Sequence, residues 1–169
     1  EILQNCLEAH MKVAGISVLG VNGIKSRIKI SAYGKYLRRL ILKNRLEGKV
    51  RVLGNLSAEE MKREYLSAQI FVCPSAVENS PNSVAEGQLL GVPVAASRTG
   101  GIPDVVKDGV SGLLFENGNI HELAACVSRI LTDKQLAKEL SASERETAAK
   151  LYNGENNYQK LIEIYQSIE

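Results

Sequence analysis

Short apolar runs alternate with helical patterns along all 169 residues of the chain. The runs cover residues 11–15, 50–53, 70–73, 92–96 and 112–115. They are mostly apolar and do not alternate regularly between apolar and polar residues. Strands buried on both faces have this composition, and a helix between successive strands favours parallel pairing with right-handed crossovers. The pattern therefore predicts an α/β fold, a Rossmann-like doubly wound parallel sheet with helices on both faces.

Helical patterns precede, separate and follow these runs, except at residues 16–26, which are irregular and rich in glycine. They predict helices at 2–9, 33–46, 57–67, 82–90, 102–107, 120–131, 134–152 and 156–168. The third of these helices starts with a capping box, Ser57-x-x-Glu60. A break at Asn153–Gly154 precedes the last helix and is not a domain boundary. A single domain over residues 1–169 is expected, with residues 153–169 as a final helix packing on it.

Composition excludes several classes of protein. A net charge of +2 is too small to argue for a nucleic-acid partner or an acidic membrane. The three cysteines are far apart and contain no C-x-x-C pair, so neither a disulfide framework nor a zinc site is expected. No apolar run approaches the roughly 20 residues of a membrane span. We expect a cytoplasmic protein, with the inner face of a membrane as one place where it can act.

The segment after the strand at 70–73 carries the densest chemistry in the chain. A polar loop leads into a helix, and Glu78 and Glu86 are separated by seven residues. Parallel sheets bind ligands outside the carboxyl ends of their strands, and a helix N-terminus there offers backbone N–H groups to a phosphate. Two acids beside such a helix indicate a site for a phosphate-bearing, hydroxyl-rich molecule.

The start of this helix can be placed in two ways. Ser80 is the N-cap with Pro81 in the first turn, or Ser83 is the N-cap and Glu86 closes a capping box. In either case a diphosphate fits against the helix end without a metal ion. Glu86 lies about one turn into the helix, where a carboxylate can take both hydroxyls of a ribose. Glu78 precedes the helix, on the other side of the phosphates, and is expected to face the sugar or the leaving group.

Each of these features also has a purely structural interpretation. Glu86 alone is equally well explained as half of a capping box, and Glu78 as a solvated loop acid. Asn and Ser in such loops are common turn formers. We interpret 91–93 as a helix stop and 100–103 as a tight turn. The basic stripe on the helix at 33–46 is interpreted as a solvated face, with phosphate or lipid-headgroup contact as the lesser option; it comprises Lys35, Arg38, Arg39 and Lys43.

Three blocks of sequence resemble the retaining glycosyltransferases of the family-4 type, which include sucrose-synthase-like and glycogen-synthase-like enzymes. Residues 77–97 resemble the family's E-G-F-G-x3-E-A-M-A-C-G-x-P-V-V-A-S block. Residues 100–114 resemble its G-G-I-P-E-V-V-x-D-G-x-T-G-L-L block, and 51–54 its V-x-F-L-G. The similarity covers residues 11–131 and implies the C-terminal, donor-binding half of a two-domain GT-B enzyme in polysaccharide biosynthesis.

The resemblance also implies roles for individual residues. Glu86 would hold the ribose, backbone groups of Asn82 and Ser83 would meet the diphosphate, and Glu78 would act as the catalytic contact to the sugar. A UDP-, GDP- or ADP-sugar would be the donor, and a glycan or lipid-linked acceptor would bind to a missing N-terminal domain. The reaction would be retaining, by front-face displacement, with no metal and no cofactor. The chain alone is therefore not expected to be a competent hexosyltransferase.

Two departures from the family pattern concern the donor site. The family's Gly-Phe-Gly is replaced by Asn79, Ser80 and Pro81, and proline cannot donate a backbone hydrogen bond. Side chains of Asn79 or Ser80 would have to remake that contact. The Arg and Lys that clamp the diphosphate in the family have no counterpart before the helix at 2–9.

Two other functions remain open from the residues. The first is a non-catalytic nucleotide-binding or interaction module of the same fold. The second is a nucleotide-sugar epimerase, which is disfavoured because neither histidine, His10 or His121, lies near Glu78 in the sequence.

Overall fold

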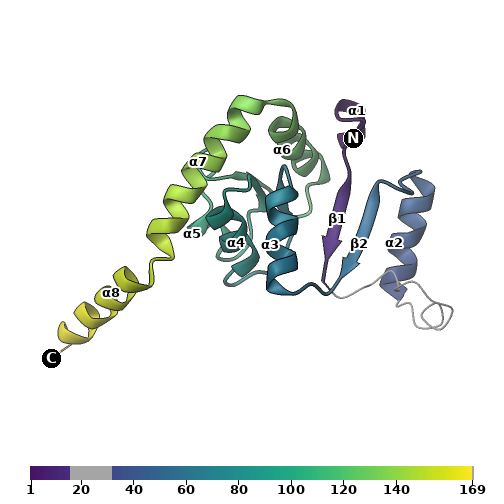
Figure 1. The fold of residues 1–169 in the computed structure, drawn as a ribbon. Helices are drawn as coiled ribbons and strands as arrows, with labels where there is room; N and C mark the ends of the chain where they lie inside the picture. The colour runs from purple at the N-terminus through teal and green to yellow at the C-terminus, as the bar shows by residue number, and fades with distance from the viewer. Residues whose placement is uncertain (16–31, 169) are drawn as a thin grey trace. The chain divides into compact units, whose positions relative to one another are not determined.

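The structure is a computed structural model that describes residues 1–15 and 32–168 (Figure 1). It contains two compact units. One comprises Glu1–Cys6 together with Tyr65–Glu169, and the other comprises Leu7–Glu64. Residues 16–31, which follow the strand predicted at 11–15, lie outside the described residues. Each unit is described by itself below.

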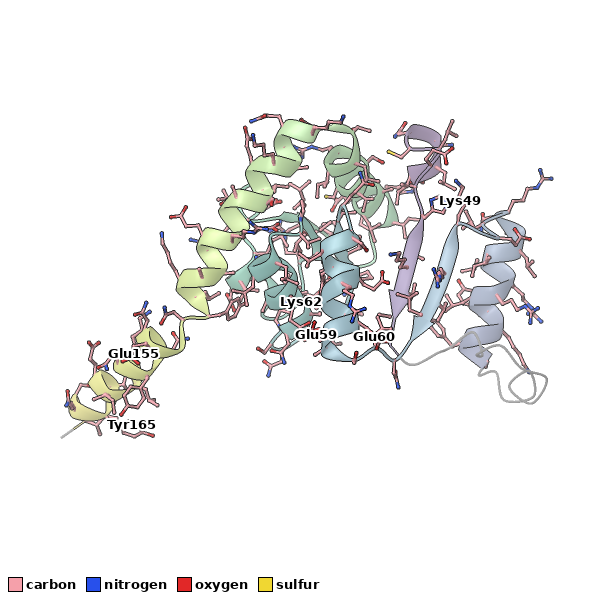
Figure 2. The ribbon with its side chains drawn as sticks, in the orientation of Figure 1. Lys49, Glu59, Glu60, Lys62, Glu155 and Tyr165 are labelled. Carbon is pink, nitrogen blue, oxygen red and sulfur yellow. The ribbon has the colours of Figure 1, made fainter. Side chains whose placement is uncertain are left out.

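The unit Leu7–Glu64 contains a parallel pair of strands, β1 (Met11–Ala14) and β2 (Val50–Gly54). Helix α2 spans Ala32–Lys43, and α3 (Ala58–Ser67) begins in this unit. The predicted capping box at the start of α3 is confirmed. The Glu60 carboxylate, labelled in Figure 2, accepts hydrogen bonds from the Ser57 backbone N–H at 2.8 Å and from the Ser57 hydroxyl at 2.7 Å. These bonds, the backbone one first, lower the pKa of Glu60.

The larger unit is built on a parallel sheet in the order β3-β4-β5. These strands span Phe71–Cys73, Val94–Ser97 and Leu113–Phe115. Phe71 is paired with Val94, and Ala95 with Leu113. Every residue of β4 and β5 is buried, which explains the continuously apolar sequence of these strands.

Both faces of this sheet are covered. Val94 and Ala96 of β4 point to one face, where they join a cluster with Val84 of α4 (Asn82–Leu90) and with Ile102 of α5 (Ile102–Val105). The intervening Ala95 points to the opposite face. There it packs in a second cluster that includes Val127, Ile130 and Leu140, from α6 (Ile120–Thr132) and α7 (Lys134–Leu151). The predicted Rossmann-like arrangement, with helices on both faces, is confirmed.

Side-chain and glycine caps set the ends of several helices. Asn119, Asp133 and Asn153 cap α6, α7 and α8 (Gly154–Gln166) through their side-chain oxygens. Gly91 ends α4 in the left-handed conformation, with φ 69°, which confirms the helix stop predicted at 91–93. The first helix, α1, spans Ile2–Asn5 and is shorter than the 2–9 predicted.

The last helix, α8, carries no buried residue. Figure 2 labels Glu155 near its start and Tyr165 near its end. The side chains of α8 that the structure describes are all at least partly exposed. None of the helices in the described part of the chain is both long enough and apolar enough to cross a membrane.

Helix α7 is tied to the turn that leads into β4. Glu144 is fully buried, and its Oε1 accepts a hydrogen bond from the backbone N–H of Val94 at 2.9 Å. One turn away, the Ser141 hydroxyl donates to the carbonyl of Gly91 at 2.7 Å. Burial raises the pKa of Glu144 to about 8, and the Val94 N–H opposes that rise only in part. The carboxyl group is therefore mostly protonated at neutral pH.

Candidate functional site

The loop between β3 and α4 lies where the carboxyl ends of three neighbouring strands meet. The hydroxyl of Ser97, the last residue of β4, donates to the carbonyl of Ser75 at 2.6 Å. The amide of Asn117, just after β5, donates to the carbonyl of Ala76 at 3.2 Å. The loop that follows β3 is therefore held by residues at the carboxyl ends of β4 and β5, at the edge where ligands of parallel sheets bind.

The Gly100–Gly101 turn supports the same loop further along. The backbone N–H of Gly101 donates to the carbonyl of Glu78 at 3.3 Å. A Cβ atom on Gly100 would overlap that carbonyl, and one on Gly101 would overlap the carbonyl of Asn79. The interpretation of these glycines as a tight turn alone was therefore incomplete, because their lack of side chains allows the close approach of the Glu78 loop.

Helix α4 starts differently from both predictions. Pro81 occupies the N-cap position, with φ −79° and ψ 79°, and no side chain caps the helix. Ser80 is therefore not the cap, and Ser83 is the second helical residue, so it cannot form a capping box with Glu86. A purely capping role for Glu86 is excluded by this geometry.

Three backbone N–H groups around this helix start are available to a ligand. Within the part of the chain that the structure describes, the N–H groups of Asn79, Ser80 and Ser83 have no backbone or side-chain acceptor. By contrast, the N–H of Asn82 turns back to the carbonyl of Ser80 at 2.9 Å. Free N–H groups at the positive end of a helix dipole attract an anion.

Tyr65 of α3 contacts the first turn of α4. Its side chain is only 3% exposed, and its hydroxyl donates to the backbone carbonyl of Ser83 at 2.9 Å. Its ring meets that of Phe71 edge-on, with ring centres 5.2 Å apart. Burial is the main cause that raises the pKa of Tyr65, and the nearby Glu86 carboxylate raises it further. Tyr65 therefore holds the first turn of α4 through the Ser83 carbonyl.

The two carboxylates predicted for the site lie on either side of the start of α4, Glu78 in the preceding loop and Glu86 in the helix. Glu78 is half-buried in the loop, and no described residue forms a hydrogen bond or ion pair with its side chain. Glu86 is exposed in the second turn of α4, four residues after Asn82. Both carboxylates are thus left available to a ligand. Residues 1–15 and 32–168 contain no group of three or more His, Cys, Asp or Glu side chains placed to hold a metal ion.

Sequence reasoning missed the residues that support the site. Tyr65 was assigned only to a helix, and nothing in its spacing indicates the contact with Ser83. Ser97 ends β4 and Asn117 follows β5, so their places at strand ends offered a weak signal. The adjacent glycines at 100 and 101 offered a stronger signal, because a glycine pair after a strand is typical of a close backbone approach.

The parallel sheet and its helices on both faces define a Rossmann-like α/β domain. The chain belongs to the family described as Glycosyl transferases group 1, whose sequence model matches residues 8–147. The sulfoquinovosyl transferase SQD2 of Arabidopsis thaliana is 32% identical over 100 residues, which cover 57% of this chain and 20% of that protein.

Solved structures show the same fold. The Anabaena protein HepE, crystallised with UDP, is 23% identical, has a TM-score of 0.79 and is matched over 98% of this chain and 44% of its own. The C-terminal domain of the group 1 protein LpcC from Francisella tularensis has a TM-score of 0.69 at 15% identity, with 89% and 91% of the two chains covered. The chain spans less than half the length of the curated relatives it matches. It is thus a C-terminal glycosyltransferase domain of GT-B fold.

Proposed function

We propose that this chain is the donor-binding half of a retaining, metal-independent glycosyltransferase. It would transfer a hexose from a nucleotide sugar to a glycan or lipid-linked acceptor, in the cytoplasm. The carrying observation is the loop at 74–81, which is held at the ends of three strands and presents unpaired N–H groups between two carboxylates. In the Anabaena neighbour the ligand is UDP, which makes UDP the first nucleotide to test.

The donor would lie along the loop from Glu86 toward Glu78. The Glu86 carboxylate accepts hydrogen bonds from the two ribose hydroxyls, as acidic residues do in other Rossmann-like sites. The N–H groups of Asn79, Ser80 and Ser83 receive the diphosphate, a contact that requires no metal ion. The side chains of Asn79 and Ser80 supply polar contacts at the position where Pro81 has no N–H to donate. Glu78 then faces the sugar.

In the proposed reaction the acceptor hydroxyl attacks the anomeric carbon from the same face of the sugar that the diphosphate leaves. The bond between the anomeric carbon and the diphosphate oxygen breaks as the acceptor hydroxyl oxygen bonds to that carbon. The acceptor's proton passes to the departing phosphate oxygen. The anomeric configuration is retained because the new bond forms on the face from which the diphosphate departs. The free N–H groups stabilise the charge that grows on the leaving diphosphate. Glu78 orients the sugar and stabilises the positive charge that develops on it.

The acceptor and the enclosure of the reaction require a second half of the enzyme. Group transfer needs donor and acceptor held together and shielded from water. The relatives are more than twice as long as this chain, which is consistent with a further domain that supplies the acceptor. Closure of one half over the other would then complete the site.

Isothermal titration of the purified chain with UDP, GDP and ADP tests the donor-site proposal. One nucleotide should bind with a dissociation constant on the order of 0.1–1 mM, as expected of a site open on one side. Glu86→Ala should weaken that binding about tenfold or more, at the level of one lost pair of charged hydrogen bonds. The control, Glu163→Ala on exposed α8, should bind like the parent chain. Binding of no nucleotide, or binding unchanged by Glu86→Ala, would contradict the proposal.

A further inference from the structure

Basic residues are concentrated in one stretch of the chain. Between Glu8 and Glu47 there are nine Lys and Arg residues and no Asp or Glu. The unit Leu7–Glu64 has thirteen Lys and Arg against five Asp and Glu, a formal charge of +8. The remainder of the chain has eight against fourteen, a formal charge of −6. The net charge of +2 therefore conceals a strongly basic unit.

Helix α2 is the element of this unit that carries the densest basic surface. Lys35, Arg38, Arg39 and Lys43 are all exposed, and their spacing of three and four residues places them along the outer side of the helix. The helix contains no acidic residue. Among the described residues, none forms an ion pair with any of these four side chains. Their charge is thus uncompensated.

Apolar and aromatic side chains are exposed on the same helix. Tyr33 is 60% exposed and Tyr36 is 55% exposed, with ring centres 6.4 Å apart. Leu42 is 52% exposed and follows Arg38 and Arg39 by one helical turn, so it lies among the cations. The inward side of α2 carries the half-buried Leu37, Leu40 and Ile41 and the buried Gly34. Tyr33, one turn before Leu37, begins that side, whereas Tyr36 borders the cations.

We propose that the outer side of α2 binds the surface of a lipid bilayer that contains anionic lipids. The cations attract the headgroups, at about fivefold in affinity for each residue near the surface. The two tyrosines suit the headgroup level, where amphipathic rings are favoured, and Leu42 can enter the boundary with the acyl chains. The twelve residues of α2 extend roughly 18 Å, which suits an extended charged surface better than a single phosphate group.

A bilayer is favoured over a nucleic acid because of the exposed leucine. Phosphate contacts would use the four cations and base stacking could use the tyrosines, but neither uses Leu42 among the cations. The residues of this surface differ from those of the donor site, so the inference does not rest on the proposed function.

Sedimentation of the protein with vesicles tests the proposal. One set of vesicles is phosphatidylcholine alone, and in the other about a third of the lipid is phosphatidylglycerol. The protein should sediment with the anionic vesicles only, and added salt should weaken the binding. The variant with Lys35, Arg38, Arg39 and Lys43 changed to Gln should bind at least about tenfold more weakly, a cautious value for four cations. Replacing Tyr33 and Tyr36 by Ser should also reduce binding.

A matched control separates this surface from net charge. Changing Lys134, Lys138, Lys150 and Lys160 to Gln removes the same charge from exposed positions of α7 and α8, and should leave vesicle binding within about twofold. Circular dichroism and UDP titration of each variant report folding and the donor site independently. Equal loss in the control, no binding to anionic vesicles at low salt, or tighter binding of a short RNA that displaces the vesicles would overturn the proposal. Displacement by millimolar inorganic phosphate would reduce the surface to a simple anion site and would also overturn it.

Discussion

The backbone of Gly100 lies directly against the carbonyl group of Glu78, with no room for a side chain between them. Gly100 has φ 53°, a left-handed conformation that side chains rarely adopt. Its neighbour Gly101 donates a hydrogen bond to the same carbonyl. The position of the Glu78 loop therefore depends on a glycine pair that follows a different strand.

Gly100→Ala should displace the Glu78 loop. The added methyl group overlaps the carbonyl oxygen of Glu78, and the backbone there cannot yield as a flexible side chain would. We expect sugar transfer by the full-length enzyme to fall about tenfold or more, a loss typical of catalytic groups moved by about 1 Å. The measurement is kcat/KM together with the melting temperature.

Gly109→Ala is the matched control for this substitution. Gly109 also has a left-handed backbone, with φ 74°, but a Cβ atom there meets nothing within 4 Å. This variant should lose about 1–2 kcal/mol of stability from backbone strain and keep its kcat/KM. If both variants lose activity equally, strain rather than contact with the Glu78 loop explains the effect.

Glu78→Ala in the full-length enzyme should remove most sugar transfer while nucleotide affinity stays within about threefold of the parent value. The reason is the position of Glu78 in the loop before α4, beyond the unpaired N–H groups proposed to hold the diphosphate. Steady-state kinetics and UDP titration measure the two effects separately. An equal loss of nucleotide affinity would show that Glu78 belongs to the nucleotide-binding part of the site.

Tyr65→Phe should loosen the first turn of α4. It removes the hydroxyl that donates to the Ser83 carbonyl while keeping the ring packed against Phe71. We expect a stability loss of about 1 kcal/mol, with a severalfold weaker affinity for the nucleotide. Denaturant unfolding and UDP titration provide the two measurements.

Tyr152→Phe offers a comparison, since the half-buried Tyr152 lies at the end of α7 and its hydroxyl has no hydrogen bond among the described residues. Tyr152→Phe should change neither the stability nor the UDP affinity by much. An unchanged UDP affinity in Tyr65→Phe would limit Tyr65 to a structural role.

Stability should fall as pH rises between about 4.5 and 8 because of Glu144. Its pKa is raised to about 8 in the folded protein, against 4.5 as the ordinary value, so the folded state holds a proton that the unfolded state releases in this range. The free energy of unfolding then decreases by up to about 1.4 kcal/mol per pH unit from this group. Urea unfolding at a series of pH values measures the slope.

Glu144→Gln should flatten that slope, because its amide oxygen still accepts from Val94 without titrating. Above pH 8 the variant should be more stable than the parent. Glu139→Gln, at an exposed position of the same helix, should leave the slope unchanged. A slope that persists in Glu144→Gln would assign the pH dependence to another group.

Metal chelators should not reduce the activity of the full-length enzyme. The sequence has no Asp-x-Asp, a pattern that would suit a divalent ion bridging a diphosphate. Backbone N–H groups at a helix start can neutralise a diphosphate in its place. Activity measured with and without EDTA, and with added Mg²⁺ or Mn²⁺, checks this prediction. A strict requirement for either ion would contradict the metal-independent mechanism.

Much of the architecture could be predicted because its signals are local. The all-apolar stretches at β4 and β5 require burial on both faces, and the helices between strands require parallel pairing. Ser57 and Glu60 form their capping box three residues apart, and Gly91 ends its helix through its own backbone freedom. Each of these features depends only on neighbouring residues.

The start of α4 shows where local reasoning failed. Ser80 and Ser83 were both plausible caps, yet Pro81 takes the position. The first turn is held from outside the segment, by Tyr65 on the carbonyl of Ser83, and a contact between α3 and α4 leaves no trace in local spacing.

The amino-acid sequence by itself thus determined the strand and helix order, the parallel sheet and the acidic loop after β3, because periodicity and end signals act over a few residues. Only the tertiary structure decided which groups support that loop. Ser97, Gly101 and Asn117 reach it from strands or turns far along the chain, and Glu144 is buried beside Val94 although 50 residues separate them. Those contacts arise from the packing of whole elements, which no short stretch of sequence specifies.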